Sequence, residues 1–311
     1  MTVNSNLDYF LAKQVVDYSP EDGIQRPQEV VYRIRLSYDD FDEGKSIGGL
    51  TDAFAKDPNA GQVTELIFGA FDFESSDSTE GIVSKLVEYK DVFKSLKAIF
   101  IGDITYEENE ISWINQSNVG PVLDAYPALE HFQVRGGNDL SFGKLMHENL
   151  KTLIIETGGL PPNVVAEVSA AHLPALRKLE IWFGSENYGF NSAIGDLATI
   201  ISGKPFPQLK ELGLMNSEIQ NEIAIEVSKS PVLDQLEVLD LSMGILDDKG
   251  GEAILNSEGM KKLKHINLRH HYLSNDMMSK LSARYPGINL DEQEEADDDG
   301  DESYRYIEVS E

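Results

Sequence analysis

One six-residue pattern recurs at constant spacing near the carboxyl end of the chain. Apolar residues fill its first, fourth and sixth positions, as in LKELGL, LEVLDL and LKHINL, and these copies begin 27 residues apart at Leu209, Leu236 and Leu263. Another apolar residue follows each copy after five positions, at Ile219, Leu246 and Leu273. Regularity in both pattern and period indicates stacked repeats, because a single unit of this kind cannot bury its own apolar face.

Weaker copies of the pattern extend the repeats over most of the chain. They begin at Val31, Val63, Leu96, Leu129, Leu150, Leu176 and, after the clear copies, Tyr285. The ten copies lie about 28 residues apart on average, which leaves room for a helix after each strand. The spacers support this, since Ile219, Ile223 and Val227 recur at helical spacing. We therefore predict an α/β solenoid of about ten repeats, with a curved parallel sheet inside and helices outside.

The repeats divide the chain into three predicted parts. Residues 1–30 precede the first copy and form an amino-terminal cap, residues 31–290 form the repeat domain, and residues 291–311 form a tail with 11 acids against the single base Arg305. Such a tail is typically solvated. Within it, residues 304–309 alternate aromatic or aliphatic with charged side chains, which favours a short strand docked on the last repeat or along the concave face.

Composition excludes several classes of function. Asp and Glu total 54 against 26 Lys and Arg, a net charge of −28, and such a surface repels nucleic acid and anionic membranes. The start of the chain does not have the pattern of an export signal, and no run of 18 apolar residues predicts a membrane span. The chain has no cysteine, so disulfides and thiol chemistry are excluded and a cytoplasmic location is expected.

The concave face carries the candidate binding residues, because side chains between and just after the strand leucines point there. Its middle is predicted to be apolar, and exposed aromatic and Met side chains mark recognition surfaces. Cover by the cap, by the 184–208 insertion or by the tail is the alternative. The predicted apolar anchors are Phe100, Trp182, Phe183 and Met215, and the predicted polar contacts are Asp103, Arg135, Glu156, Asp240, Arg269 and His270.

No motif predicts catalysis or a cofactor. The chain contains no GxSxG, GxxxxGK[ST], HExxH or GxGxxG. His265, His270 and His271 fall in one unit, but strand alternation and the following turn direct their side chains differently, so no metal site is predicted. We expect a protein that is not an enzyme and that needs no cofactor.

The repeats resemble the ribonuclease-inhibitor subtype of leucine-rich repeats, most closely over residues 236–255. The whole chain also resembles a poorly characterised bacterial family of cytosolic leucine-rich-repeat proteins. That resemblance rests on GDIT at 102–105, EISWI at 110–114, VRGG at 134–137, ETGGLP at 156–161, NSEI at 216–219 and LDLSMG at 239–244. It implies the fold and a cytosolic location, and it implies no activity.

Two functions remain open from the sequence. The first is a non-catalytic scaffold, expected to be monomeric, that binds a protein or peptide on its concave face. The second is an accessory protein or enzyme of bacterial peptide maturation, with a metal or a cationic substrate at the acidic carboxyl-terminal end. The resemblance implies this alternative, since genes of the family lie beside those of radical-type peptide-modifying enzymes.

Overall fold

The computed structural model describes residues 3–298 and 303–311. Its contacts divide the chain into two compact units. The N-terminal unit contains the residues up to Leu153 together with Ala171–Leu173, and the C-terminal unit contains Ile154–Ala170 and Pro174–Ser310. Each unit is an α/β structure in which strands pair mostly in parallel and in chain order.

The strands of the N-terminal unit begin with an antiparallel hairpin and continue in parallel. They are β1 (Tyr9–Phe10), β2 (Lys13–Asp17), β3 (Val30–Ile34), β4 (Glu65–Gly69), β5 (Ala98–Asp103) and β6 (His131–Arg135), while β7 (Thr152–Glu156) lies at the boundary of the units. Both faces of β3, β5 and β6 are buried along their whole length. These strands therefore have cover on the side away from their helices as well.

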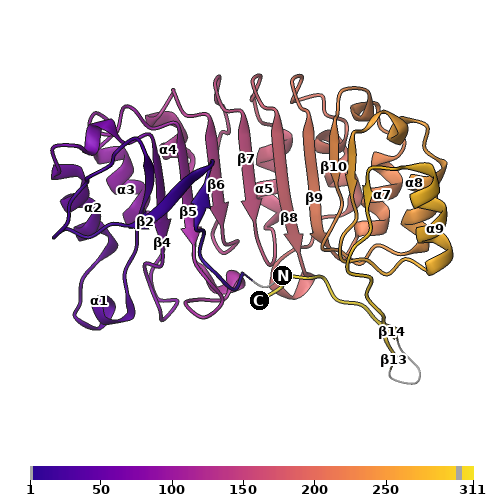
Figure 1. Ribbon diagram of the computed structural model, residues 1–311, viewed down its shortest axis with the longest axis horizontal. Helices are drawn as coiled ribbons and strands as arrows, with labels where there is room; N and C mark the ends of the chain where they lie inside the picture. The colour runs from indigo at the N-terminus through magenta and orange to yellow at the C-terminus, as the bar shows by residue number, and fades with distance from the viewer. Residues whose placement is uncertain (1–2, 299–302) are drawn as a thin grey trace. The chain divides into compact units, whose positions relative to one another are not determined.

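Short helices cover one face of these strands (Figure 1). They are α1 (Tyr38–Asp42), α2 (Ile47–Lys56), η1 (Ala60–Gln62), α3 (Glu80–Glu88), η2 (Ile111–Trp113) and α4 (Gly120–Ala125). Helix α2 starts where Ser46 accepts a hydrogen bond from the Gly49 N–H, as an N-cap residue does. Its Phe54 is fully buried and packs against the ring of Phe93. The same periodicity that predicted helices thus supplies the core.

The C-terminal unit repeats the arrangement of parallel strands joined by helices. Its strands are β8 (Lys178–Gly184), β9 (Glu211–Ser217), β10 (Val238–Asp240), β11 (His265–Asn267) and β12 (Ile288–Asn289), and a short hairpin pairs β13 (Asp297–Asp298) with β14 (Ser303–Tyr304). Val238 pairs with Glu211 on one side and with His265 on the other, so the strand register reproduces the 27-residue period.

The helices of this unit follow its strands. They are α5 (Pro162–Ser169), α6 (Ala198–Ile201), α7 (Gln220–Val227), α8 (Asp248–Asn256) and α9 (Asn275–Arg284), with single 3₁₀ turns η3 (Glu186–Tyr188), η4 (Ile194–Leu197), η5 (Pro231–Asp234) and η6 (Gly259–Lys262). Neighbouring helices pack on each other, and Leu239, Ile254 and Leu281 are fully buried.

The predicted strands coincide with strands of the structure at every copy of the pattern. The helices follow the prediction less evenly. The interval that starts at Leu129 is only 21 residues long, and the described chain forms isolated bridges there, such as Met146 with His172, in place of a helix. Mostly parallel strands with intervening helices are compatible with a solenoid.

Among the described residues, no helix combines the length and the apolar character needed to cross a bilayer.

A bulge in β5 makes one glycine necessary. Phe68 pairs with Ile101, but the next residue, Gly69, pairs with Asp103, so Gly102 is an extra residue with φ of +106°. A Cβ on Gly102 would lie 2.5 Å from the Arg135 carbonyl oxygen. Only glycine fits both the backbone conformation and this close approach.

Replacing Gly102 with Ala should therefore destabilise the fold by more than about 1 kcal/mol, measured by chemical denaturation. Gly81→Ala is the matched control, since Gly81 is exposed in α3 with nothing within 4 Å of an added Cβ. There the helix should gain up to about 1 kcal/mol. Equal effects of the two changes would contradict this account of the bulge.

Candidate functional site

In the N-terminal unit, the chain's own amino-terminal segment covers the strand face opposite the helices (Figure 1). Phe10 stacks on Phe100 with ring centroids 6.3 Å apart, and Leu7 packs against the same cluster as Ile67. Phe100 is consequently fully buried. The prediction that Phe100 is an exposed anchor is wrong, because the hairpin of β1 and β2 occupies the surface on which a partner would lie.

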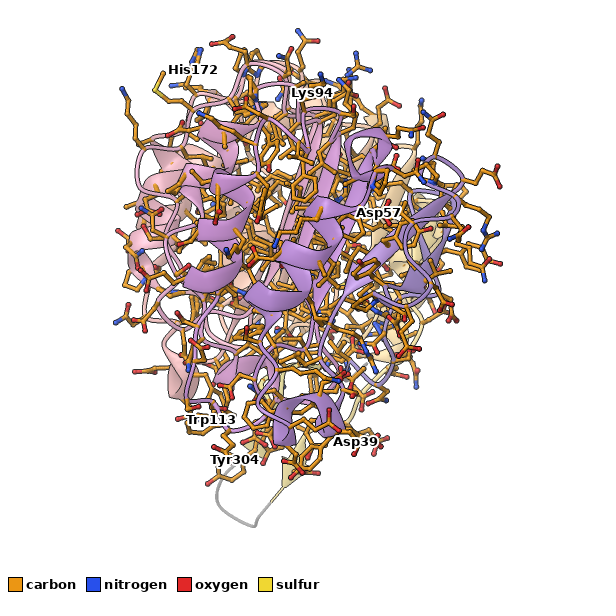
Figure 2. The ribbon with its side chains drawn as sticks, turned by 90° about the vertical axis from the view of Figure 1, so that its left-hand side faces the viewer. Asp39, Asp57, Lys94, Trp113, His172 and Tyr304 are labelled. Carbon is orange, nitrogen blue, oxygen red and sulfur yellow. The ribbon has the colours of Figure 1, made fainter. Side chains whose placement is uncertain are left out.

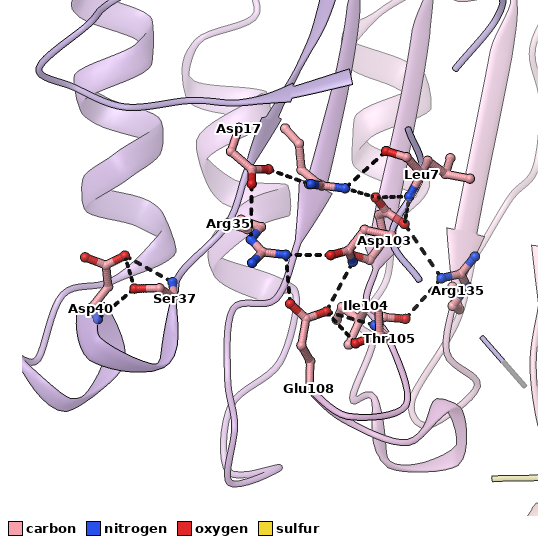
Figure 3. Close-up of polar contacts among 12 residues, drawn as sticks. Leu7, Asp17, Arg35, Ser37, Asp40, Asp103, Ile104, Thr105, Glu108 and Arg135 are labelled. Atoms are coloured by element: carbon pink, nitrogen blue, oxygen red, sulfur yellow. Dashed lines mark hydrogen bonds and ion pairs between the residues drawn. The ribbon is translucent and has the colours of Figure 1, made fainter. Parts of the chain in front are cut away.

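A buried carboxylate fixes this cover in place (Figure 3). Asp103 is fully buried, and its carboxylate lies 2.7 Å from the Arg33 guanidinium and 3.8 Å from that of Arg135. It also accepts the Leu7 N–H at 3.2 Å, while the Asp103 carbonyl accepts a hydrogen bond from the Asn6 side chain. Asp103 therefore binds the amino-terminal segment and is not open to a partner.

Two further arginines complete the network (Figure 3). Arg35 lies 2.9 Å from Glu108, which also accepts hydrogen bonds from the backbone and hydroxyl of Thr105. Arg135 donates to the Ile104 carbonyl at 3.1 Å and lies over the Phe100 ring, 5.2 Å from its centroid. Arg135 is thus a buried structural residue, and its prediction as a partner contact is wrong for the same reason as that of Asp103.

In the C-terminal unit, strand alternation separates two neighbouring aromatic residues. β8 continues to Gly184, so Phe183 points with Leu179 and Ile181 into the core, where it packs against Phe190. Trp182 points to the opposite, open face and is half-buried. The prediction of Phe183 as an anchor is wrong because the residue was assigned to a turn, whereas it belongs to a strand of period two.

Met215 pairs in register with Trp182, but it is largely buried. A Cβ on Gly213 would lie 3.2 Å from the Met215 sulfur and 3.1 Å from Glu180 Cγ, so these two side chains fill the space above the glycine. Met215 therefore packs within the open face and does not project from it. Of the four predicted apolar anchors, Trp182 keeps accessible surface.

Acidic side chains surround Trp182 on the open face. We call Glu180, Glu211 and Asp240 the acidic row. Glu180 accepts a hydrogen bond from the Trp182 indole N–H at 3.2 Å and pairs with Lys178 at 2.9 Å. Asp240, two strands away, accepts hydrogen bonds from Asn267 and Ser242.

The charges of the row shift two pKa values. Burial raises the pKa of Asp240, and the negative charge of Glu180 raises it further, against the hydrogen bonds that lower it. Burial acts to lower the pKa of Lys178, but the carboxylates of the row outweigh burial and leave that pKa raised. The row thus has more negative than positive charge in a partly desolvated setting, which suits a cationic ligand.

The remaining predicted polar contacts are engaged within the chain. Glu156 is buried at the end of β7. Arg269 forms a two-pronged ion pair with Glu308 of the carboxyl-terminal tail, at 2.7 and 2.5 Å, and also contacts Glu292 at 2.9 Å. His270 Nε2 lies 3.1 Å from the Tyr306 carbonyl. Arg269 and His270 therefore hold the tail in this structure.

Three potential metal ligands meet at the same place. The ligand atoms of His270, Glu292 and Glu308 lie within 4.8 Å of one another. Imidazole and carboxylate donors suit a divalent transition metal. The Arg269 guanidinium, however, already contacts both carboxylates and compensates their charge. A divalent ion would have to displace this guanidinium.

Sequence reasoning missed Asn216, which contacts the tail from the turn after β9. Asn216, Met243 and His270 occupy equivalent positions 27 residues apart, and all have positive φ, between 53° and 70°. Asn tolerates this left-handed conformation better than most residues, so an Asn two positions after the repeat pattern was the available signal.

Removing the buried carboxylate should open the N-terminal unit. Asp103→Ala leaves Arg33 buried without its closest partner, which should cost about 3–5 kcal/mol in the free energy of unfolding, measured by denaturation. Asp39→Ala is the control, because Asp39 is exposed on α1 (Figure 2), and it should change stability by no more than about 0.5 kcal/mol. Similar losses in both variants would show that the network does not hold the segment.

One solved structure shows how the chain is related to other proteins. The crystal structure of a Bacteroides fragilis protein, from the Northeast Structural Genomics Consortium, is 36% identical in sequence. The match covers 89% of this chain and 76% of that one, with a TM-score of 0.80. No protein-family model and no curated protein matches the chain. The chain belongs to the same family as this Bacteroides fragilis protein.

Proposed function

We propose that the chain is a leucine-rich-repeat solenoid of the ribonuclease-inhibitor subtype that binds a protein or peptide without catalysis. The 27-residue register of β9, β10 and β11, with a helix after each strand, supports the repeat type. About ten such units account for the strands from β3 to β12. The absence of cysteine from the sequence supports a cytoplasmic location.

The observation that carries the proposal is the contrast between the open faces of the two units. In the N-terminal unit, residues 3–17 cover the strands, and a buried ion-pair network closes over them. In the C-terminal unit, Trp182 remains partly accessible beside the acidic row. A half-exposed tryptophan with carboxylates around it is suited to a partner that inserts a basic side chain.

The acidic row sets the chemistry of the partner. Asp240 is mostly desolvated, and its hydrogen bonds come from neutral groups, Asn267 and Ser242. A Lys or Arg side chain placed beside Asp240 and Glu180 would gain charge-assisted hydrogen bonds, and its aliphatic part could pack on the Trp182 ring. We therefore propose that the partner presents a basic segment to β8, β9 and β10.

Trp182→Ala should weaken binding by about 2 kcal/mol, or roughly 30-fold in Kd, if Trp182 is the anchor. The partner is captured on the immobilised full chain, and its affinity is then measured by calorimetry. Trp113→Ala is the matched control, since Trp113 is 52% exposed in η2 of the other unit (Figure 2). Unchanged affinity of the Trp182 variant would refute the assignment.

Binding of a basic partner should depend on pH through Asp240. Because burial raises the pKa of Asp240 above its usual 3.8, the free chain retains the proton to higher pH, and a cationic partner favours the charged form. Affinity should therefore rise as the pH increases from 3.8 through the raised pKa and then level off. Asp240→Asn should remove this part of the pH dependence in a calorimetric titration. An identical pH profile in the variant would count against contact at Asp240.

A further inference from the structure

The carboxyl-terminal tail lies in a site that binds its backbone through specific hydrogen bonds. The Asn216 side chain donates to the Val309 carbonyl and accepts the Val309 N–H. The Glu308 N–H donates to the Met243 carbonyl at 2.9 Å. The Tyr272 hydroxyl accepts the Tyr306 N–H and donates to the Tyr306 carbonyl. Pairing of this kind is typical of proteins that recognise extended peptides.

The side chains of the tail are read at alternate positions. Ile307 and Val309 are buried, at 8% and 1% exposure, and Glu308 between them forms the two-pronged pair with Arg269. Arg305 contacts Asp247 and lies over the Tyr272 ring. By contrast, the Tyr306 side chain is 58% exposed. The site thus selects an aliphatic–Glu–aliphatic sequence with a basic residue three positions before the Glu.

Three successive turns of the C-terminal unit build this site. Asn216, Met243 and His270 follow β9, β10 and β11 at equivalent positions, and each contacts the tail from a backbone with positive φ. In Figure 1 the tail passes the lower ends of these strands. Non-glycine residues in this conformation cost free energy and collect where backbone geometry serves binding. Three of them along one extended segment mark a repeated binding position.

From these contacts we infer that the turns form a peptide-binding site, that the chain's own tail occupies it, and that a partner segment with the same pattern competes with the tail. The site lies at the carboxyl ends of the strands and uses neither Trp182 nor the acidic row. It goes beyond the proposed function, and each can fail without the other.

Covalent linkage weakens the apparent affinity of a competing segment. An attached ligand acts at an effective concentration in the millimolar range for a short linker, so a free peptide of the same sequence competes poorly with it. Release of the tail should therefore be the step that makes the site available. This fixes the design of the test, in which the tail must be displaced without removing any contact on the acceptor side.

The test uses a fluorescent synthetic peptide with the sequence of residues 303–311 and the full-length chain. The variant Ile307→Asp, Val309→Asp removes the buried side chains of the attached tail and leaves Asn216, Met243, Arg269 and Tyr272 unchanged. This variant should bind the peptide, measured by fluorescence anisotropy, at least about 30-fold more tightly than the wild type. Tyr306→Ser is the control, because the exposed ring leaves docking intact and binding should match the wild type.

A charge exchange tests the sequence preference. Arg269→Glu, added to the undocked variant, should weaken binding of the peptide by at least about 30-fold, and a peptide with Glu308→Arg should recover binding to it. Hydrogen exchange of the wild-type tail supplies a second readout, since excess peptide should accelerate exchange at residues 306–309.

Failure of the undocked, folded variant to bind the peptide would overturn the inference, as would equal binding by variant and wild type. Binding that is insensitive to Arg269→Glu would also overturn it. Should the undocked variant not fold, the exchange experiment on the wild type decides, and an unchanged tail in excess peptide refutes the inference. None of these outcomes involves Trp182, so the proposed function is tested separately.

Discussion

The fold depends on a burial requirement that no single repeat can meet. Each strand presents apolar residues at alternate positions to a helix layer, and the ladder hydrogen bonds of the strand must be satisfied by its neighbours. In the C-terminal unit the two needs coincide, because the parallel register that satisfies the ladder also places Leu212, Leu239 and Ile266 side by side in the core. A constant period of 27 residues follows from that coincidence.

The same requirement explains the roles of the chain ends. The face of a strand opposite the helices has no repeat to cover it. In the N-terminal unit, residues 3–17 take that position, and Asp103 is buried at their base with arginines on either side. In the C-terminal unit, residues 305–309 fill the turns after the strands. The residues that cover the two units differ in kind, since the first set is an aromatic cluster with a buried ion pair and the second an extended segment held by its backbone.

Much of the architecture could be predicted from periodicity, and little of the site could. The strands were located because their apolar positions repeat, and α7 was located by Ile223 and Val227. Phe183 was misplaced because one further strand residue reverses the direction of every side chain after it. Phe100 was placed on the correct face, yet the ring of Phe10, 90 residues earlier, covers it. Periodicity reports on neighbouring repeats, and it contains no information about which distant segment lies over them.

The difference in burial between the two ends has a consequence for ionic strength. The Asp103 carboxylate is fully buried, so dissolved ions screen its attraction to Arg33 only weakly. The pair between Arg305 and Asp247 lies at the surface, where salt within a Debye length weakens such attractions. Raising the salt concentration would therefore loosen the outer end of the carboxyl-terminal tail while the amino-terminal segment stays closed. Salt concentration thus acts on the two termini selectively, although both are held by arginine and carboxylate groups.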